Sequence, residues 1–150
     1  MANFDVYNGP GEKLADNQPS PFTIEGLEPN KTYSDWKIAY AGSDVKVDFP
    51  EFTTKPRLLT SFRVDNTNIS GEAGGTATAN LSYFTPADAT DKSVKVGIED
   101  NTVATITDNG DNTYTLNLLK AGTTKVHWVA KDGGGAKADA TVTVTETPGE

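Results

Sequence analysis

The chain has no cysteine and only one histidine, His127, among its 150 residues. Without thiols it can form no disulfide framework, no zinc–thiolate or iron–sulfur site, and no cysteine nucleophile. With one imidazole, it cannot build a site that needs two. These absences exclude several classes of metalloprotein and thiol enzyme.

Basic charge and long apolar runs are also scarce. Thirteen Lys and Arg against twenty-one Asp and Glu give a net charge of −8, whereas binders of nucleic-acid backbones concentrate Lys and Arg on one surface. No run approaches the roughly 18 apolar residues of a membrane span. Residues 1–5 carry neither the basic nor the apolar part of a signal peptide. We therefore expect no nucleic-acid partner, no membrane insertion, no signal peptide, and synthesis in the cytoplasm.

Strand patterns dominate the second half of the chain, and helical periodicity is nearly absent. Thr, Val and aromatic residues alternate with polar residues in short runs separated by Gly, Pro, Asn and Asp. The predicted strands cover residues 59–64, 76–83, 93–98, 103–107, 113–118, 125–130 and 140–145. Asn109-Gly110 suits a tight hairpin turn between two of them. This spacing predicts an antiparallel β-sandwich over residues 57–146, followed by a frayed tail at 147–150.

The first 56 residues differ in composition from the rest of the chain and carry six of the eight prolines. Strands are predicted at residues 4–7, 22–27, 34–41 and 45–54, which indicates a smaller β module. Pro56 marks the boundary between the modules, because proline cannot donate to a strand ladder.

Five segments of the second half carry a family resemblance over residues 58–145. They are TPADATDKSV (85–94), DNTVATI (100–106), NTYT (112–115), KAGTT (120–124) and ATVTV (140–144). In order and spacing they resemble a bacterial immunoglobulin-like domain of group 2, which implies an all-β, Ig-like sandwich. The family often has a strand Trp where this chain has Val96-Gly97, and we expect Trp128 to fill that space in the core.

The first module is similar to the last part of a fibronectin type III domain. Residues 27–33 (LEPNKTY) resemble the stretch that carries the tyrosine corner, and residues 52–56 (FTTKP) resemble the closing strand and exit. The opening strands of that family are missing, which leaves an open edge and an incompletely covered apolar face. We expect the module to be completed by the second module, by another copy of the chain, or by a larger assembly. Its large apolar side chains are Phe22, Ile24, Trp36, Ile38, Tyr40, Phe49 and Phe52.

No catalytic, cofactor or metal site is predicted. His127 alternates out of phase with Val126 and Trp128 and should face solvent, and there is no Gly-x-Ser-x-Gly motif. The glycine-rich stretches 71–75 and 133–135 read as strand connections. Two alternatives stay open: a buried Lys–Asn or Lys–Asp crosslink, and a weak calcium site. The acids considered for calcium are Asp88, Asp91, Glu99 and Asp100, which could meet at one end of the sandwich.

Trp36 and Tyr40 are the two candidate contact residues for a partner or a glycan, since exposed aromatic rings stack on sugars. Their alternation with Ile38 favours a core role instead.

The two module types, without signal or catalytic residues, resemble a small accessory structural protein of a tailed phage. The expected function is non-enzymatic display of an Ig-like domain on a capsid or tail, with weak adhesion to the host surface. The expected partners are phage capsid or tail proteins, host surface glycans, and other copies through the N-terminal module. The alternatives are a stalk or spacer of a bacterial surface adhesin, located at the cell surface, and a carbohydrate-binding accessory module.

Overall fold

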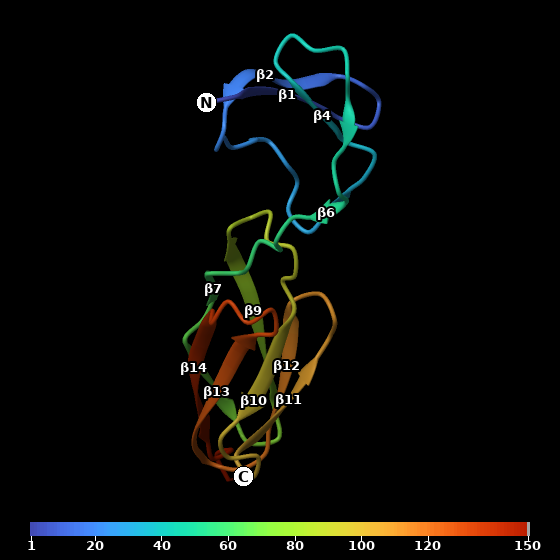
Figure 1. Cartoon of the computed structure of the whole chain (residues 1–150). Helices are drawn as coiled ribbons and strands as arrows, with labels where there is room; N and C mark the ends of the chain where they lie inside the picture. The colour runs from blue at the N-terminus through green and yellow to red at the C-terminus, as the bar shows by residue number, and fades with distance from the viewer. Residues whose placement is uncertain (150) are drawn as a thin grey trace. The chain divides into compact units, whose positions relative to one another are not determined.

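The computed structural model describes residues 1–149 and divides into two compact units, Met1–Pro56 and Arg57–Glu150 (Figure 1). We call them the N-terminal unit and the C-terminal unit. All regular elements of the described residues are strands. No helix of the described residues is long and apolar enough to cross a membrane.

The C-terminal unit is built from two four-stranded sheets. The first has the order β10-β13-β14-β8, and its strands are Val94–Ile98, Gly122–Ala130, Lys137–Thr145 and Asn68–Glu72. The second has the order β11-β12-β9-β7, and its strands are Ala104–Asp108, Thr113–Leu118, Thr76–Thr85 and Ser61–Val64. All neighbouring strands run antiparallel except β14 and β8, which are parallel.

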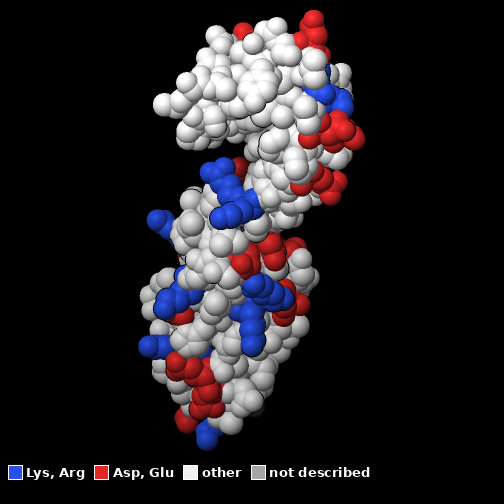
Figure 2. Space-filling model, in the orientation of Figure 1, with Lys and Arg blue, Asp and Glu red and all other residues white. Residues whose placement is uncertain are grey.

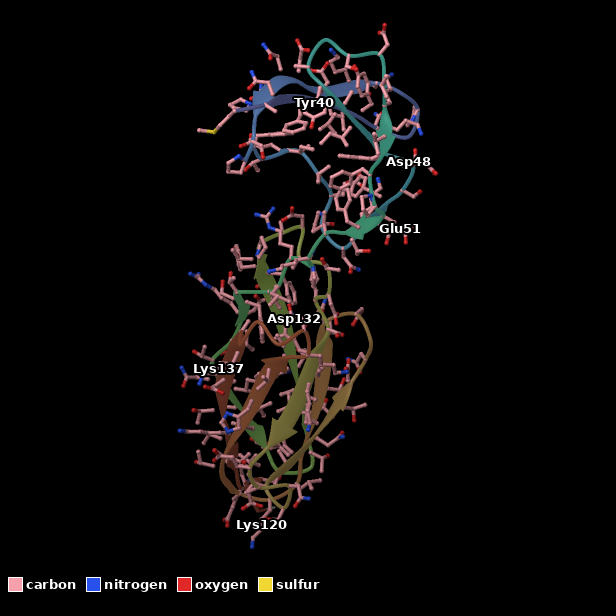
Figure 3. The ribbon with its side chains drawn as sticks, in the orientation of Figure 1. Tyr40, Asp48, Glu51, Lys120, Asp132 and Lys137 are labelled. Carbon is pink, nitrogen blue, oxygen red and sulfur yellow. The ribbon has the colours of Figure 1, made fainter. Side chains whose placement is uncertain are left out.

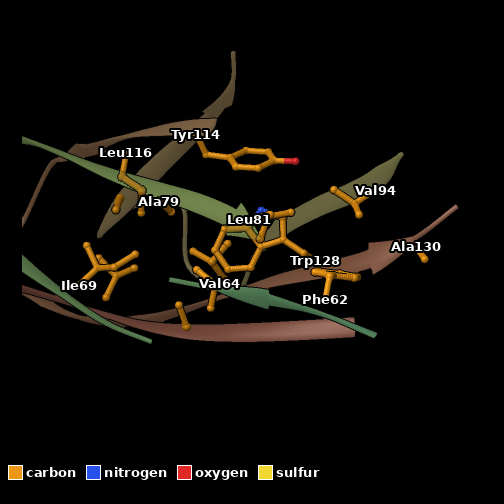
Figure 4. Close-up of a cluster of buried hydrophobic side chains, with 14 of the residues drawn as sticks. Phe62, Val64, Ile69, Ala79, Leu81, Val94, Tyr114, Leu116, Trp128 and Ala130 are labelled. Carbon is orange, nitrogen blue, oxygen red and sulfur yellow. The ribbon is translucent and has the colours of Figure 1, made fainter. Parts of the chain in front are cut away.

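The core of this unit is filled by inward side chains from both sheets (Figure 4). Trp128 of β13 is completely buried and meets Tyr114 of β12 edge-on, with 5.6 Å between ring centroids. Trp128 also pairs in register with Val96 of β10, so it does occupy the core beside the position where the family often has a tryptophan. Other fully buried side chains are Leu59, Leu116, Leu118, Val126 and Val142.

Most strands predicted in the C-terminal unit lie within one to three residues of their observed limits, but β8 was not predicted. Its sequence, NISGE, offers a single buried apolar residue, Ile69, so it lacks the alternation that signals a strand. Gly71 fits there because a Cβ would lie 2.5 Å from the Leu118 side chain. The hairpin between β11 and β12 has positive φ at Gly110 (90°), as predicted from the Asn-Gly pair. The second positive φ of this turn is at Asn112 (63°) and not at Asn109.

The N-terminal unit has one four-stranded sheet of order β2-β1-β4-β5 and a short pair, β3-β6. The strands are β1 (Asn3–Tyr7), β2 (Lys13–Pro19), β3 (Thr32–Tyr33), β4 (Lys37–Tyr40), β5 (Val47–Asp48) and β6 (Phe52–Thr53). Only three of its hydrophobic residues are buried: Val6, Trp36 and Ala39.

Two strand predictions for this unit were wrong, the strand predicted at 34–41 begins only at Lys37, and strands β2 and β3 were not predicted. Residues 22–27 form no strand; Gly26 in this segment has φ of 77°, outside the extended region. The single strand predicted at 45–54 is two short strands, interrupted around Pro50, which has no N–H to donate. Strand β2 was not predicted, because its sequence KLADNQP is polar on both faces.

The predicted frayed tail 147–150 forms no strand over its described residues, 147–149. The Thr147 hydroxyl donates a hydrogen bond to the Ala73 carbonyl over 2.8 Å. Glu150 lies outside the described residues.

Candidate functional site

One face of the N-terminal sheet is apolar and only partly covered. Phe4 and Val6 of β1 stand opposite Tyr40 and Ile38 of β4, so these four side chains share a face. Val6 is buried, Phe4 and Ile38 are half-buried, and Tyr40 is 64% exposed and stacks on Phe4 with centroids 5.3 Å apart. Sheets normally bury such a face against another layer, and here much of that layer is missing.

A cluster of aromatic rings lies next to this face. Trp36 is edge-on to Tyr33 and to Phe52, at centroid distances of 5.4 and 5.3 Å, and Phe49 meets Phe52 at 5.8 Å. The Tyr33 hydroxyl accepts a hydrogen bond from the Glu28 backbone N–H over 2.8 Å, which has the form of a tyrosine corner. These contacts join the turn that follows the coil 21–27 to the cluster.

An open groove of about 610 Å³ lies between the apolar face and this coil. It is lined by the apolar side chains of both, with no charged residue. The lining includes Val6, Pro21, Phe22, Ile24, Leu27, Trp36, Ile38, Phe49 and Phe52. In the view of Figure 2, much of the N-terminal unit is uncharged, with its acidic residues gathered along one side.

A second hollow, of about 1080 Å³, shares Thr23, Ile24, Leu27 and Trp36 with the first. Its lining adds four charged residues: Glu25, Glu28, Lys31 and Asp35. Lys31 forms an ion pair with Glu28, and no ion pair within the described residues involves Glu25 or Asp35. We call Glu25, Glu28, Lys31 and Asp35 the acidic rim; its formal charge is three acids less one base, or −2.

The opposite face of the sheet is anchored by a buried carboxylate, Asp5. It accepts a hydrogen bond from the Asn17 backbone N–H over 2.8 Å and an ion pair from Lys13 over 3.0 Å. The Asn17 hydrogen bond, followed by that from Lys13, lowers the pKa of Asp5 below its ordinary 3.8. This buried, paired charge has a structural role, and sequence alternation gave no sign of it.

Of the two candidate contact residues, Trp36 is 4% exposed and Tyr40 is 64% exposed. The Trp36 ring is enclosed by its aromatic neighbours, as a core role requires, and has little surface for a glycan. Tyr40, labelled in Figure 3, stacks on Phe4 and still leaves most of its side chain accessible. Leu27 and Tyr33 were expected from the sequence only as part of the tyrosine corner, and Phe4 was not expected at the site, although its alternation with Val6 was a usable signal.

His127 of β13 sits between two carboxylates on the outer face of the C-terminal unit. Its Nδ1 lies 2.5 Å from Asp139 Oδ1 on β14, and its Nε2 lies 2.8 Å from Glu99 Oε1. Hydrogen bonding to Asp139, then to Glu99, raises the pKa of His127 above 6.5. Both ring nitrogens are engaged by carboxylates, so the imidazole is not poised to activate a nucleophile.

The acids considered for calcium are each engaged separately. Asp88 pairs with Arg57, Asp91 accepts from the Ser93 N–H, and Asp100 accepts from the Thr102 N–H and hydroxyl. In the described part of the chain, no group of three or more His, Asp or Glu side chains could hold a metal ion. None of the lysines in residues 1–149 is buried, whereas the internal crosslink considered above needs a buried one.

The stretch 133–135 connects β13 to β14 through a close backbone approach. Asp132, labelled in Figure 3, accepts hydrogen bonds from the backbone N–H groups of Leu59 and Gly134. A Cβ on Gly134 would lie 2.2 Å from the Leu59 carbonyl oxygen. This connection is a fixed contact to the first residues of the C-terminal unit.

The C-terminal unit is thus an Ig-like sandwich whose polar residues are used in turns and ion pairs. The family model of the bacterial Ig-like domain (group 2) matches residues 59–144. This match covers more than half of the chain, and the chain belongs to that family. A search of curated proteins found no match.

Several solved structures share this fold. Domains 4 and 5 of the S-layer protein SbsC align at a TM-score of 0.51 and 18% identity, over 81% of this chain and 69% of that one. Domains 1–6 of the same protein align at a TM-score of 0.56 and 18% identity, over 99% of this chain and 20% of that one. The N-terminal four Ig domains of Dscam1 isoform 7.44 align at a TM-score of 0.53 and 13% identity, over 97% of this chain and 38% of that one. At these identities the likeness shows the fold alone, and the chain spans a minor part of the two longer fragments.

Proposed function

We propose that the chain is a non-enzymatic structural protein of a phage virion, in which the N-terminal unit attaches to the capsid or tail and the C-terminal unit is displayed. The observation that carries this proposal is the open apolar groove of the N-terminal unit. A unit with only three buried hydrophobic residues has a small core of its own, so a docking partner would add to its stability.

The C-terminal unit supports a display role. It has a complete core and two full sheets, and its loops are fixed by Asx-type hydrogen bonds such as those of Asp100 and Asp111. A rigid sandwich of this kind presents its loops in a defined geometry. Many copies on one particle would convert weak contacts with a host surface into avidity.

The N-terminal unit supports a fibronectin type III-like ancestry. The hydrogen bond from Glu28 to Tyr33 and the closing pair β3-β6 lie where the resemblance expects the tyrosine corner and the exit strand. We propose that the strands missing from this module are replaced by the assembly to which it binds.

A second candidate function is a spacer in a bacterial surface protein. The observation that favours it is the likeness of the whole chain to domains of an S-layer protein. This reading predicts further modules and an export signal in a longer parent chain. It places the protein on the cell envelope instead of the virion.

Mass spectrometry of purified virions from the source phage or induced prophage, with immunogold electron microscopy, tests the proposal. We expect the protein in particles, with labelling on the capsid or the tail. Absence from particles, together with detection on the bacterial envelope, would reject the virion role in favour of the surface spacer.

A further inference from the structure

The coil 21–27 beside the groove leaves its backbone unpaired. Within the described residues, neither its N–H groups nor its carbonyl oxygens make a hydrogen bond. Backbone polar groups in folded proteins are nearly always paired with protein or water. An unpaired run next to an apolar surface is therefore a position where another strand can be added.

The side chains of this coil alternate as those of a strand do. Phe22 and Ile24 are half-buried, whereas Thr23 and Glu25 are exposed, and of these four residues only Glu25 does not line the groove. The opposite wall is provided by Val6 and Ile38 of the sheet. An added strand that pairs with the coil would thus place every second side chain between two apolar walls.

We propose that the groove binds an extended segment of a partner protein by strand addition, and that this segment alternates apolar and polar residues and carries Lys or Arg next to its apolar part. Main-chain hydrogen bonds to the coil would provide affinity, and the groove would select the alternate apolar side chains. The inference rests on the proposed attachment role, because it names the mode of that attachment.

Charge distinguishes this occupant from a second copy of the chain. The acidic rim carries a formal charge of −2, with Glu25 and Asp35 in no ion pair of the described residues. A second copy would bring the same acidic rim, and like charges facing each other oppose association. Basic residues flanking an apolar segment complement the rim.

Hydrogen–deuterium exchange of the full-length chain tests the proposal. The probes are a panel of synthetic peptides of roughly nine residues, the span of a strand, with valine, isoleucine or phenylalanine alternating with serine and lysines at both ends. Controls are scrambled peptides without alternation and peptides with glutamate at the ends. We expect fast exchange at residues 22–27 in the free chain, and exchange slowed about tenfold by the alternating, lysine-flanked peptides only.

Two pairs of variants locate the binding. Ile24→Ser removes an apolar wall and should abolish binding, whereas Val45→Ser removes an exposed apolar side chain that lines neither hollow and should preserve it. Glu25→Gln combined with Asp35→Asn should weaken binding about fivefold. Asp44→Asn should not, since Asp44 lines neither hollow. Unchanged exchange in β1 and β4 would show that each variant remains folded.

Several results would overturn the proposal: slow exchange at 22–27 in the free monomer, concentration-dependent protection that reveals a second copy, or equal binding of alternating and scrambled peptides. Failure of the whole panel to bind would also overturn it. The peptide test is independent of virion composition. Peptide binding with absence from particles rejects only the virion role, and presence in particles without binding rejects only strand addition.

Discussion

Tyr33 Oη accepts a hydrogen bond from the backbone N–H of Glu28 over 2.8 Å, and the Tyr33 ring stacks on Phe52 with centroids 5.5 Å apart. One side chain therefore fixes the turn 28–31 and joins it to strand β6. Phe52 lines the groove, so this link connects the turn to one of the groove's walls.

Tyr33→Phe should destabilise the N-terminal unit by about 1 kcal/mol, because the ring stays while the Glu28 N–H loses its partner. Faster hydrogen exchange over residues 27–55 would report the loss. Tyr40→Phe is the matched control, since no hydrogen bond within the described residues uses the Tyr40 hydroxyl. An equal effect of both substitutions would mean that the Tyr33 hydroxyl contributes nothing specific.

Gly134→Ala should destabilise the C-terminal unit by about 1–3 kcal/mol, the usual range for overpacking. The added Cβ would lie 2.2 Å from the Leu59 carbonyl oxygen and 3.1 Å from the Leu58 Cβ, so the backbone has to move. Urea unfolding followed by circular dichroism measures the change.

Gly97→Ala is the control for this prediction, because a Cβ there meets nothing within 4 Å. Alanine in a strand should be neutral or slightly stabilising relative to glycine. If Gly134→Ala is equally well tolerated, the contact between the 133–135 connection and residue 59 is not a fixed one.

Trp128 is completely buried, and its Nε1–H has no hydrogen-bond partner among residues 1–149. Trp128→Ala should cost about 3–5 kcal/mol through the large cavity that it leaves. Trp128→Phe should cost about 1 kcal/mol, because the lost volume is partly offset by removal of an unsatisfied donor. Thermal unfolding of the two variants makes the comparison, and similar losses in both would show that the indole N–H is satisfied.

The C-terminal unit could be predicted well because burial follows its alternation. In β12, residues Tyr114, Leu116 and Leu118 are apolar and buried, so the strand was predicted at its observed limits, Thr113–Leu118. The same logic failed for β8 and β2. Their positions are set by pairing with β14 and β1 and not by a buried face of their own.

The groove could be predicted only in outline. The N-terminal unit has many large apolar residues for its small size, which indicated that its apolar face is incompletely covered. The alternation of Phe22 and Ile24 is that of a strand. It therefore could not predict that the backbone of residues 22–27 forms no hydrogen bonds with a neighbouring strand. Pairing depends on whether a partner strand is within reach, which a local pattern does not contain.

The ordinary pKa of histidine is 6.5, and that of His127 is raised in the folded chain, first by Asp139 and then by Glu99. The folded protein therefore keeps its imidazole charged at pH values where the unfolded chain has lost the proton. The contribution of this charge to stability is complete below 6.5. It is lost as pH rises through the folded pKa.

We expect the thermal midpoint of the wild type to fall between about pH 6 and pH 8 relative to that of His127→Gln, which cannot titrate there. Lys125→Gln, on the same face of β13, should keep the wild-type slope because it leaves His127 and its two carboxylate partners in place. His127 is the only histidine, so its ring proton resonances can be followed by NMR in the same samples. Parallel pH profiles for wild type and His127→Gln, or an NMR midpoint at or below 6.5, would contradict the ion pairs with Asp139 and Glu99.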